Sequence, residues 1–330
     1  MEYRKNVGKY VIIALVLVVL IAAAFFVIGL WEKQQGKYTG AIVEDGVLRY
    51  KGEEYVRKAG LETFLVLGLD KYQGAASAES HEGGVQADFL MLFIFDNDAK
   101  QCQAVQINRD TMTTVNRLGI GGVKTDSFTR QIALAYNYVA DNNDKIRCRN
   151  TKDSVEALLH GVKVDHYLSL TMDSVAAMND FVGGVELTVL DDFTGIDDAL
   201  VKGQKVTLKG EQALHYVRTR YGLEDSTNST RMARQQQYIQ ALYGKVTASA
   251  EADEGFLIKL VDKVDDYVVY DSSDLRMQKF AEKFGTYEFL GITNIEGEAK
   301  TGEFMEFYPD EDALWKLVIE QFYVPVKDRS

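Results

Sequence analysis

The chain is poor in the residues that build linkers, disulfide frameworks and zinc sites. Its 330 residues contain only two prolines, two cysteines and four histidines. This scarcity excludes a proline-rich linker protein and a disulfide-built miniprotein. Cys102 and Cys148 form no CxxC pair and the histidines are scattered, so no zinc site is indicated. The sequence leaves open whether the two cysteines pair, because it does not establish that they are close in space.

Basic residues are also scarce relative to acidic ones. The 37 Lys and Arg residues face 49 Asp and Glu residues, which gives a net charge of −12. Neutralised phosphates supply most of the affinity of nucleic-acid-binding proteins, so this balance argues against a general nucleic-acid binder. Apolar residues make up 46% of the chain and charged residues 26%, which is typical of a globular protein.

One long apolar run is present near the N-terminus. Residues Val11 to Leu30 carry no charge, and their number suits a bilayer-spanning helix. Three basic residues precede the run and aromatic residues bracket it, which predicts a cytoplasmic tail at 1–10, a transmembrane anchor at 11–31 and an extracellular remainder. A cleaved signal peptide is the alternative. Ala22 to Ala24 would supply its cleavage site, but the apolar run continues beyond them.

Beyond a short stalk predicted at 32–60, strand-like and helix-like patterns alternate. Continuous apolar runs predict strands at 63–69 and 89–95, followed by a strand at 101–107 and shorter ones at 167–170 and 185–189. Helical spacing appears at 132–139, after caps at Thr151 and Thr171, and from about Thr230. Strands interleaved with helices predict an α/β sandwich whose sheet is covered on both faces.

Arginines occur where an anion would bind. Arg109 directly follows the third strand, at the end where open α/β sheets place ligands. Arg218 and Arg220 are two residues apart, so in an extended segment both would point to one face. One polar stripe at the start of a helix, whose positive end favours anions, holds Arg231, Arg234, Gln235 and Tyr238. Guanidinium groups suit bidentate phosphate binding, and the alternative is that each arginine is an exposed surface group.

Two aspartates form the acidic counterpart. Asp70 ends one apolar strand and Asp88 begins another. Two carboxylates beside phosphate oxygens are what Mg²⁺ usually needs, because water and phosphate complete its octahedron. The alternative is that both are ordinary turn residues at strand ends. No complete nucleotide motif is present, since Val123 stands where GIGGVKT would need a glycine to form a P-loop.

Several motifs together resemble the LytR–CpsA–Psr (LCP) family of membrane-anchored bacterial enzymes that attach glycopolymers to the cell wall. The strongest stretch is LKGEQALHYVRTRYGLEDSTNSTRMARQQQ at 208–237. VLGLD at 66–70, INRDT at 107–111 and FVGGV at 181–185 also resemble family motifs. The resemblance implies a three-layer sandwich with a central mixed sheet between helices, and we assign it to an extracellular catalytic domain at 61–325.

The resemblance also implies roles for the residues singled out above. Asp70 and Asp88 would hold Mg²⁺, or another divalent cation such as Mn²⁺, or one of them would serve as base. A hydrophobic cleft would accept the lipid chain of the donor. The catalytic residues would be Asp70, Asp88 and Arg109, and the pyrophosphate-binding residues Arg109, Arg218, Arg220, Arg231 and Gln235.

The function expected from the resemblance is cell-wall polymer ligation. A membrane-anchored phosphotransferase would move a glycopolymer from a polyprenyl-pyrophosphate carrier to a peptidoglycan hydroxyl outside the membrane. The alternatives are a non-catalytic envelope protein that binds lipid-linked polymer with a regulatory role, and a polyprenyl-pyrophosphate hydrolase. The sequence departs from the family pattern at Asn108, where the family has proline, and at Ala87 and Phe89, which flank Asp88.

Overall fold

The computed structural model describes residues 41–44, 46–72, 84–302 and 304–326. The predicted cytoplasmic tail and the transmembrane anchor at 11–31 lie outside these residues. Within the described ranges, no helix combines the length and the apolar character needed to cross a bilayer. The chain divides into two compact units, one formed by residues 1–58 and 318–330 and the other by residues 59–317.

The smaller unit contains a four-stranded sheet. Its strands are β1 (Ala41–Glu44), β2 (Val47–Tyr50), β3 (Glu53–Arg57) and β16 (Tyr323–Pro325), in that order and all antiparallel. Three of them therefore lie within the segment that the sequence indicated as a stalk. These strands are only four or five residues long, too short for a clear alternation of apolar and polar residues.

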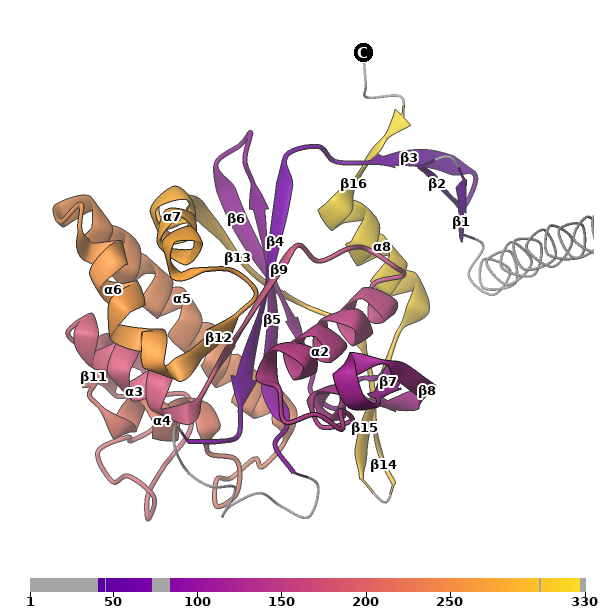
Figure 1. The fold of residues 1–330 in the computed structure, drawn as a ribbon. Helices are drawn as coiled ribbons and strands as arrows, with labels where there is room; N and C mark the ends of the chain where they lie inside the picture. Colours follow the sequence, from indigo (N-terminus) through magenta and orange to yellow (C-terminus); the bar gives the residue numbers. More distant parts are fainter. Residues whose placement is uncertain (1–40, 45, 73–83, 303, 327–330) are drawn as a thin grey trace, which may run out of the picture. The chain divides into compact units, whose positions relative to one another are not determined.

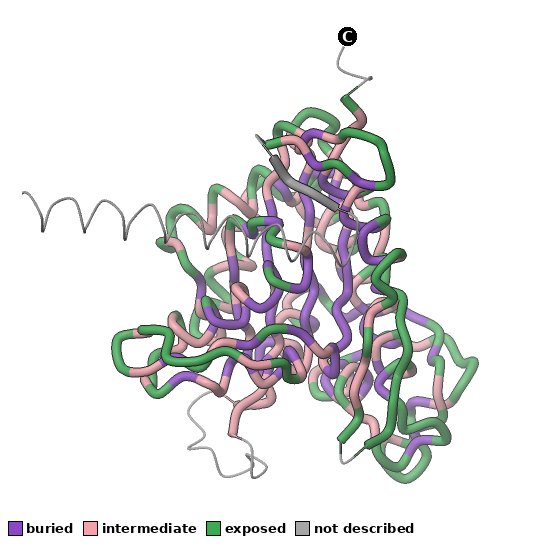
Figure 2. The backbone as a smooth tube through the Cα atoms, turned by 90° about the vertical axis from the view of Figure 1, so that its right-hand side faces the viewer, coloured by how far each residue is buried: buried purple, intermediate pink, exposed green. Residues whose placement is uncertain are grey.

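The larger unit is built on a mixed six-stranded sheet. Its order is β12–β9–β4–β5–β6–β13, with β9–β4 and β6–β13 parallel and the other pairs antiparallel. The predicted strands correspond to β4 (Leu61–Leu69), β5 (Ala87–Asp96), β6 (Gln101–Ile107) and β9 (His166–Leu170). β12 (Val268–Tyr270) and β13 (Glu288–Asn294) form the edges. Figure 2 shows burial concentrated along these central strands.

Helices cover both faces of this sheet, as the sequence predicted (Figure 1). One face carries α3 (Met172–Phe181), α4 (Glu211–Arg218), α5 (Asn228–Ala252), α6 (Phe256–Val264) and α7 (Asp274–Phe284). The other carries α2 (Asp144–Leu158) and the hairpin of β7 (Met112–Leu118) and β8 (Lys124–Gln131). The remaining elements are the hairpins β10 (Val185–Thr188) with β11 (Lys205–Leu208) and β14 (Gly297–Thr301) with β15 (Met305–Pro309), and α8 (Glu311–Phe322), which spans the boundary between the units.

Two helix predictions were wrong in detail. The spacing at 132–139 belongs to a short 3₁₀ helix, Ile132–Tyr136, whose residues are buried except for the half-buried Leu134, and no longer helix forms. The following helix starts well before Thr151. Asn143 caps it, because its side chain accepts hydrogen bonds from the backbone N–H groups of Lys145 and Ile146.

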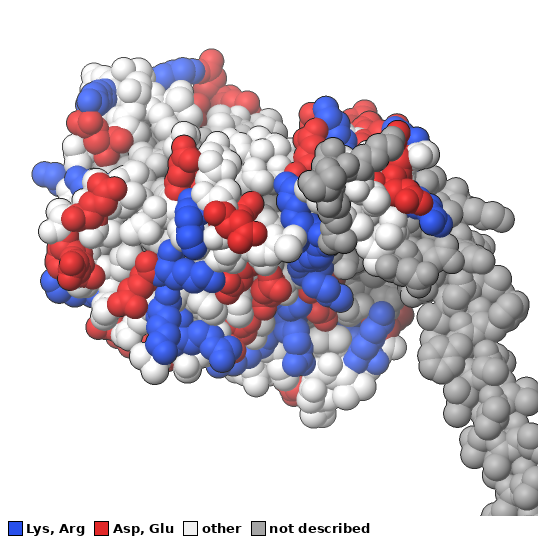
Figure 3. All heavy atoms as spheres, turned by 90° about the horizontal axis from the view of Figure 1, so that it is seen from above, with Lys and Arg blue, Asp and Glu red and all other residues white. Residues whose placement is uncertain are grey.

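The two cysteines are both free and completely buried. Burial raises the pKa of each thiol to about 12. Charges on the face drawn in Figure 3 are mixed, with acidic and basic side chains interspersed.

Candidate functional site

The two predicted aspartates lie at the same end of two central strands of the sheet. Asp70 directly follows β4, and Asp88 is the second residue of the antiparallel neighbour β5. The N–H of Asp70 donates to the carbonyl of Gln86 at 3.1 Å, and the N–H of Gln86 donates to Oδ1 of Asp70 at 2.7 Å. This reciprocal pair holds the two strand ends together and fixes the backbone on which both carboxylates stand.

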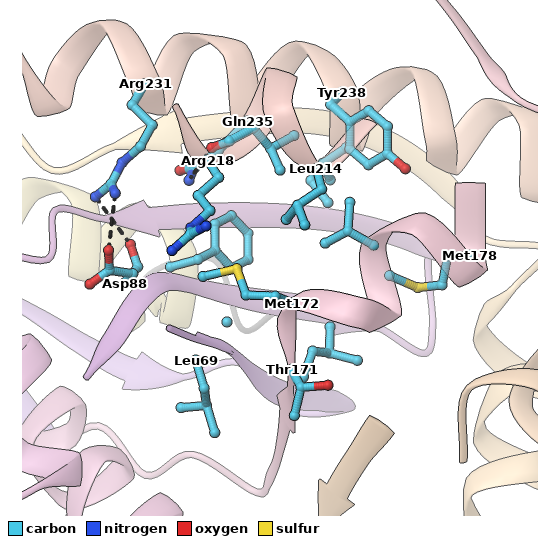
Figure 4. Close-up of a pocket in the computed structure, with 16 residues that line it drawn as sticks. Leu69, Asp88, Thr171, Met172, Met178, Leu214, Arg218, Arg231, Gln235 and Tyr238 are labelled. Atoms are coloured by element: carbon cyan, nitrogen blue, oxygen red, sulfur yellow. Dashed lines mark hydrogen bonds and ion pairs between the residues drawn. The ribbon is translucent and has the colours of Figure 1, made fainter. Parts of the chain in front are cut away.

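Asp88 lies between two guanidinium groups. Nη1 of Arg109 donates to Oδ1 of Asp88. Nη1 of Arg231 donates to Oδ2 of Asp88 at 3.0 Å (Figure 4). Arg109 reaches this position because it follows β6, the strand next to β5. Its other terminal nitrogen donates to the side-chain oxygen of Gln86. In this structure Asp88 therefore acts as the shared counter-ion of two predicted phosphate ligands.

Arg231 is almost completely buried at the start of α5. Its side chain is 5% exposed. Burial lowers the pKa of the guanidinium, and the charge of Asp88 opposes that shift. Nε and Nη2 of Arg231 both donate to Oδ1 of Asn228, at 3.1 Å and 2.6 Å. A buried cation with such fixed partners is pre-oriented, so little reorganisation is needed when an anion replaces Asp88.

Arg218 and Arg220 reach the site differently from the predicted extended segment. Arg218 is the last residue of α4, and the chain becomes extended only at Thr219. Arg218 donates to the hydroxyl of Tyr72 at 3.3 Å and lines the cavity described below. Arg220 lies close enough to oppose, with its charge, the rise in pKa that burial causes at Asp110. The structure thus brings all four predicted arginines to the same end of the central strands.

Arg234, which the spacing placed on the same stripe as Arg231, has a supporting role in this structure. It is completely buried, and its Nη1 donates to the carbonyl of Tyr216 at 2.7 Å. Its Nη2 donates to the carbonyl of Thr219, and its Nε forms an ion pair with Oδ2 of Asp191 at 2.9 Å. Arg234 therefore binds the end of α4, and so positions the segment that carries Arg218 and Arg220.

Gln235 has a similar supporting role in this structure. Its Nε2 donates to the carbonyl of Val217 at 3.2 Å, and its Oε1 accepts from Nε2 of Gln106 at 2.9 Å. Gln235 also lines the cavity beside Arg218 and Arg231. Its predicted contact with pyrophosphate stays a prediction, because both ends of its amide already have protein partners.

An apolar cavity opens beside the arginines. It has a volume of about 680 Å³, counting the part open to solvent, and lies between the ends of β4 and β5 and the helices α3, α4 and α5 (Figure 4). Three apolar residues of the predicted helices, Met172, Val175 and Ile239, line it. Asp88, Arg218 and Arg231 also form part of its wall. The site therefore joins a cluster of cations to an apolar chamber.

The predicted metal site has suitable oxygen donors, but arginine side chains already contact one of its two carboxylates. Asp70 and Asp88 offer carboxylate oxygens at adjoining strand ends, which is the donor type that Mg²⁺ takes. Both oxygens of Asp88 accept from arginines, so a cation would have to displace at least one guanidinium. Within the described part of the chain, no three His, Cys, Asp or Glu side chains gather in a way that could hold a metal. Metal binding therefore stays a prediction.

Known proteins resemble this chain over most of its length. The cell wall biosynthesis protein LcpA of Corynebacterium glutamicum is 28% identical over 236 residues, which cover 66% of this chain and 45% of LcpA. The biofilm regulatory protein A of Streptococcus mutans is 24% identical over 253 residues, covering 74% of this chain and 58% of that protein. The chain thus spans about half the length of these two curated relatives.

Solved structures share the fold. TagT bound to LI-WTA has a TM-score of 0.59 at 18% identity, with 80% of this chain and 90% of TagT covered. TagV of B. subtilis has a TM-score of 0.58 at 23% identity, with 80% of this chain and 98% of TagV covered. The model of the LytR_cpsA_psr family matches residues 34–317, which include every site residue discussed above. This protein therefore belongs to the LytR_cpsA_psr family.

Proposed function

We propose that this protein is a phosphotransferase that moves a glycopolymer from a polyprenyl-pyrophosphate carrier to a hydroxyl group of peptidoglycan. The observation that carries the proposal is the union of a cationic cluster with an apolar cavity. Arg218 and Arg231 belong to the cluster and also line the cavity. A donor with a diphosphate next to a long hydrocarbon chain matches both parts.

The proposed roles of the side chains follow from their positions. Arg109 and Arg231 would take the diphosphate in place of Asp88, and Arg218 and Arg220 would neutralise charge from the end of α4. Guanidinium groups suit this task because they bind phosphate oxygens in a bidentate manner. The prenyl chain would lie against Met172, Val175 and Ile239, where burying each methylene contributes about 0.8 kcal/mol.

The proposed reaction is a single phosphoryl transfer. The acceptor hydroxyl oxygen forms a bond to the phosphorus that carries the polymer, and the bond from that phosphorus to the bridging oxygen breaks. The electron pair of that bond leaves with polyprenyl phosphate, and the hydroxyl proton passes to the carboxylate of Asp88 or Asp70. Positioning and charge neutralisation supply most of the rate enhancement in such reactions.

We also propose that a divalent cation, Mg²⁺ or Mn²⁺, takes part. Asp70 and Asp88 would hold it, and it would neutralise charge on the diphosphate oxygens. In this proposal Asp88 exchanges arginine partners for the cation when the donor binds. Asp70 keeps its place because the backbone of Gln86 fixes it.

The location and partners belong to the same proposal. The predicted anchor at 11–31 would hold the protein in the cell membrane with its N-terminus in the cytoplasm and the catalytic domain outside. The membrane would then concentrate the enzyme near its lipid-linked donor. The two relatives compared here are a cell wall biosynthesis protein and a biofilm regulatory protein, which supports an envelope role and keeps a regulatory polymer-binding protein as the second candidate.

The test uses the full-length chain with a polyprenyl-pyrophosphoryl sugar and a soluble peptidoglycan oligomer. Mass spectrometry follows the sugar-phosphate adduct and the released polyprenyl phosphate, with and without Mg²⁺. We expect a metal-dependent adduct that is lost in Arg109→Ala and Arg218→Ala. Release of polyprenyl phosphate without adduct would indicate the hydrolase, and tight donor binding without turnover would indicate the binding protein.

A further inference from the structure

Two buried asparagines connect the loop of Arg109 to the helix of Arg231. Asn108 lies between β6 and Arg109, and Asn228 is the first residue of α5. Nδ2 of Asn228 donates to Oδ1 of Asn108 at 2.8 Å. The two side chains are 8% and 9% exposed, so this hydrogen bond is shielded from water. We call the pair the amide bridge.

Each amide of the bridge has a second partner that fixes its orientation. Oδ1 of Asn108 also accepts the backbone N–H of Asp110 at 2.9 Å. Oδ1 of Asn228 accepts two N–H groups of Arg231. The amide oxygen of Asn228 faces the guanidinium of Arg231 because only the oxygen can accept a hydrogen bond. The NH₂ group of the same amide must then face an acceptor. Asn108 provides that acceptor, so neither amide can flip without losing hydrogen bonds.

The bridge completes a closed series of contacts that includes Asp88 and both arginines. From Asn228 the contacts run to Arg231, then to both oxygens of Asp88, then to Arg109, which is the chain neighbour of Asn108. When a ligand displaces Asp88, the ionic half of this series opens. The amide half remains, and together with the hydrogen bond between Gln106 and Gln235 it still ties the start of α5 to the end of β6.

We propose that Asn108 and Asn228 are positioning residues that set the spacing of Arg109 and Arg231 for a diphosphate. This inference rests on the proposed function, since it takes the donor diphosphate as the ligand. The family pattern has proline where this chain has Asn108. Proline has no side-chain acceptor, so the bridge is a feature of this chain that the family pattern does not supply.

A purely stabilising role would give different results from a positioning role. Loss of a buried hydrogen bond lowers stability wherever it lies. A positioning pair must in addition change anion binding, and the two substitutions must not add, because either one breaks the same link. Asn97 offers a matched control. Its amide donates to the carbonyl of Gly60 and accepts from the hydroxyl of Tyr287 at the other end of β5.

The experiment measures the binding of inorganic pyrophosphate to the full-length chain by titration calorimetry. We compare Asn108→Leu, Asn228→Leu, the double variant and Asn97→Leu, each shown to be folded by circular dichroism. We expect about fivefold to tenfold weaker binding in Asn108→Leu. The double variant should be within about twofold of Asn228→Leu. Asn108→Asp, which keeps the acceptor oxygen, should restore most of the affinity, and Asn97→Leu should bind like the parent.

A second measurement does not depend on any ligand. The Nε–H signal of Arg231 in a ¹⁵N–¹H spectrum, assigned with Arg231→Lys, should shift in Asn108→Leu and stay in place in Asn97→Leu. Parental affinity in Asn108→Leu, or additive losses in the double variant, would overturn the positioning role. Failure of the parent to bind pyrophosphate would refute the proposed diphosphate site instead. In that case an unshifted Arg231 signal would refute the bridge as well, and a shifted one would support it.

Discussion

Replacement of Arg234 by methionine should destabilise the protein strongly, although Arg234 touches no predicted substrate. The guanidinium is completely buried, with two backbone carbonyls of the α4 end and the carboxylate of Asp191 around it. The side chain of Asp191 is only 13% exposed. Methionine fills a similar volume, so the substitution mainly removes charge and hydrogen bonds and leaves little cavity.

The expected loss in the free energy of unfolding follows from the buried partners that Arg234 would leave without a hydrogen bond or counter-ion. Removing one partner of a buried ion pair typically costs about 3–5 kcal/mol, because the other charge stays buried without compensation. The carbonyls of Tyr216 and Thr219 also lose donors, at about 1–3 kcal/mol for each group that water cannot reach. These terms overlap, since Asp191 can gain a proton or water. We therefore expect a loss of about 3–5 kcal/mol in the free energy of unfolding.

Urea unfolding of the full-length chain, followed by circular dichroism, measures this loss. Arg220→Met is the matched control. Arg220 is only half-buried, and its Nη2 donates to the hydroxyl of its exposed neighbour Tyr221. The Arg220→Met substitution should change the free energy of unfolding by no more than about 0.5 kcal/mol. If Arg234→Met costs no more than Arg220→Met, Arg234 does not hold α4 in the way described here.

Four further outcomes are expected. Arg218→Lys should lower the transfer rate about tenfold to a hundredfold, since an ammonium group cannot reproduce the forked contact; an unchanged rate in the mass-spectrometric assay would rule out a bidentate role. Asp88→Asn should tighten pyrophosphate binding in calorimetry while abolishing transfer, because it frees two arginines but removes a carboxylate proposed to hold the cation or to accept the proton; weaker binding would contradict the counter-ion role. Val175→Trp should raise the KM for a long-chain donor and leave that for a two-isoprene donor nearly unchanged, and equal changes would place the prenyl chain elsewhere. Burial against Trp315 lowers the pKa of His160 to about 4; the unfolded state then binds the extra proton first, so stability should fall between about pH 6.5 and 4, and His160→Phe should reduce this slope in urea titrations at several pH values.

The sheet was predictable because its central strands are buried on both faces. Leu65, Leu67 and Leu90 are completely buried in runs without polar interruption, which is the pattern of such strands. The edge strand β12 was not predictable. It has only three residues and takes its place by pairing with β9, about a hundred residues earlier in the chain, so local pattern carries no signal for it.

The arginines of the site were recognisable as a group, but their separate roles were not. Arg231 and Arg234 are three residues apart on one helix, so spacing assigns them to one stripe. The structure separates them, because Arg231 faces Asp88 and Arg234 faces the carbonyls at the end of α4. That difference depends on where α4 packs, and the sequence does not encode it locally. The cavity could not be predicted from the sequence for a similar reason, since an apolar residue such as Val175 suits a core position as well as a cavity wall.

The two buried thiols make this protein its own reporter of local opening. Cys102 lies in the central sheet on β6 and Cys148 on the covering helix α2, and the chain has no other cysteine. Raised thiol pKa values keep both groups protonated at neutral pH, so a thiol reagent reacts only when a segment opens. Labelling rates at the two positions, resolved by mass spectrometry, would compare the motions of sheet and helix in the native protein. Donor binding could then be followed as slower labelling, without any engineered probe.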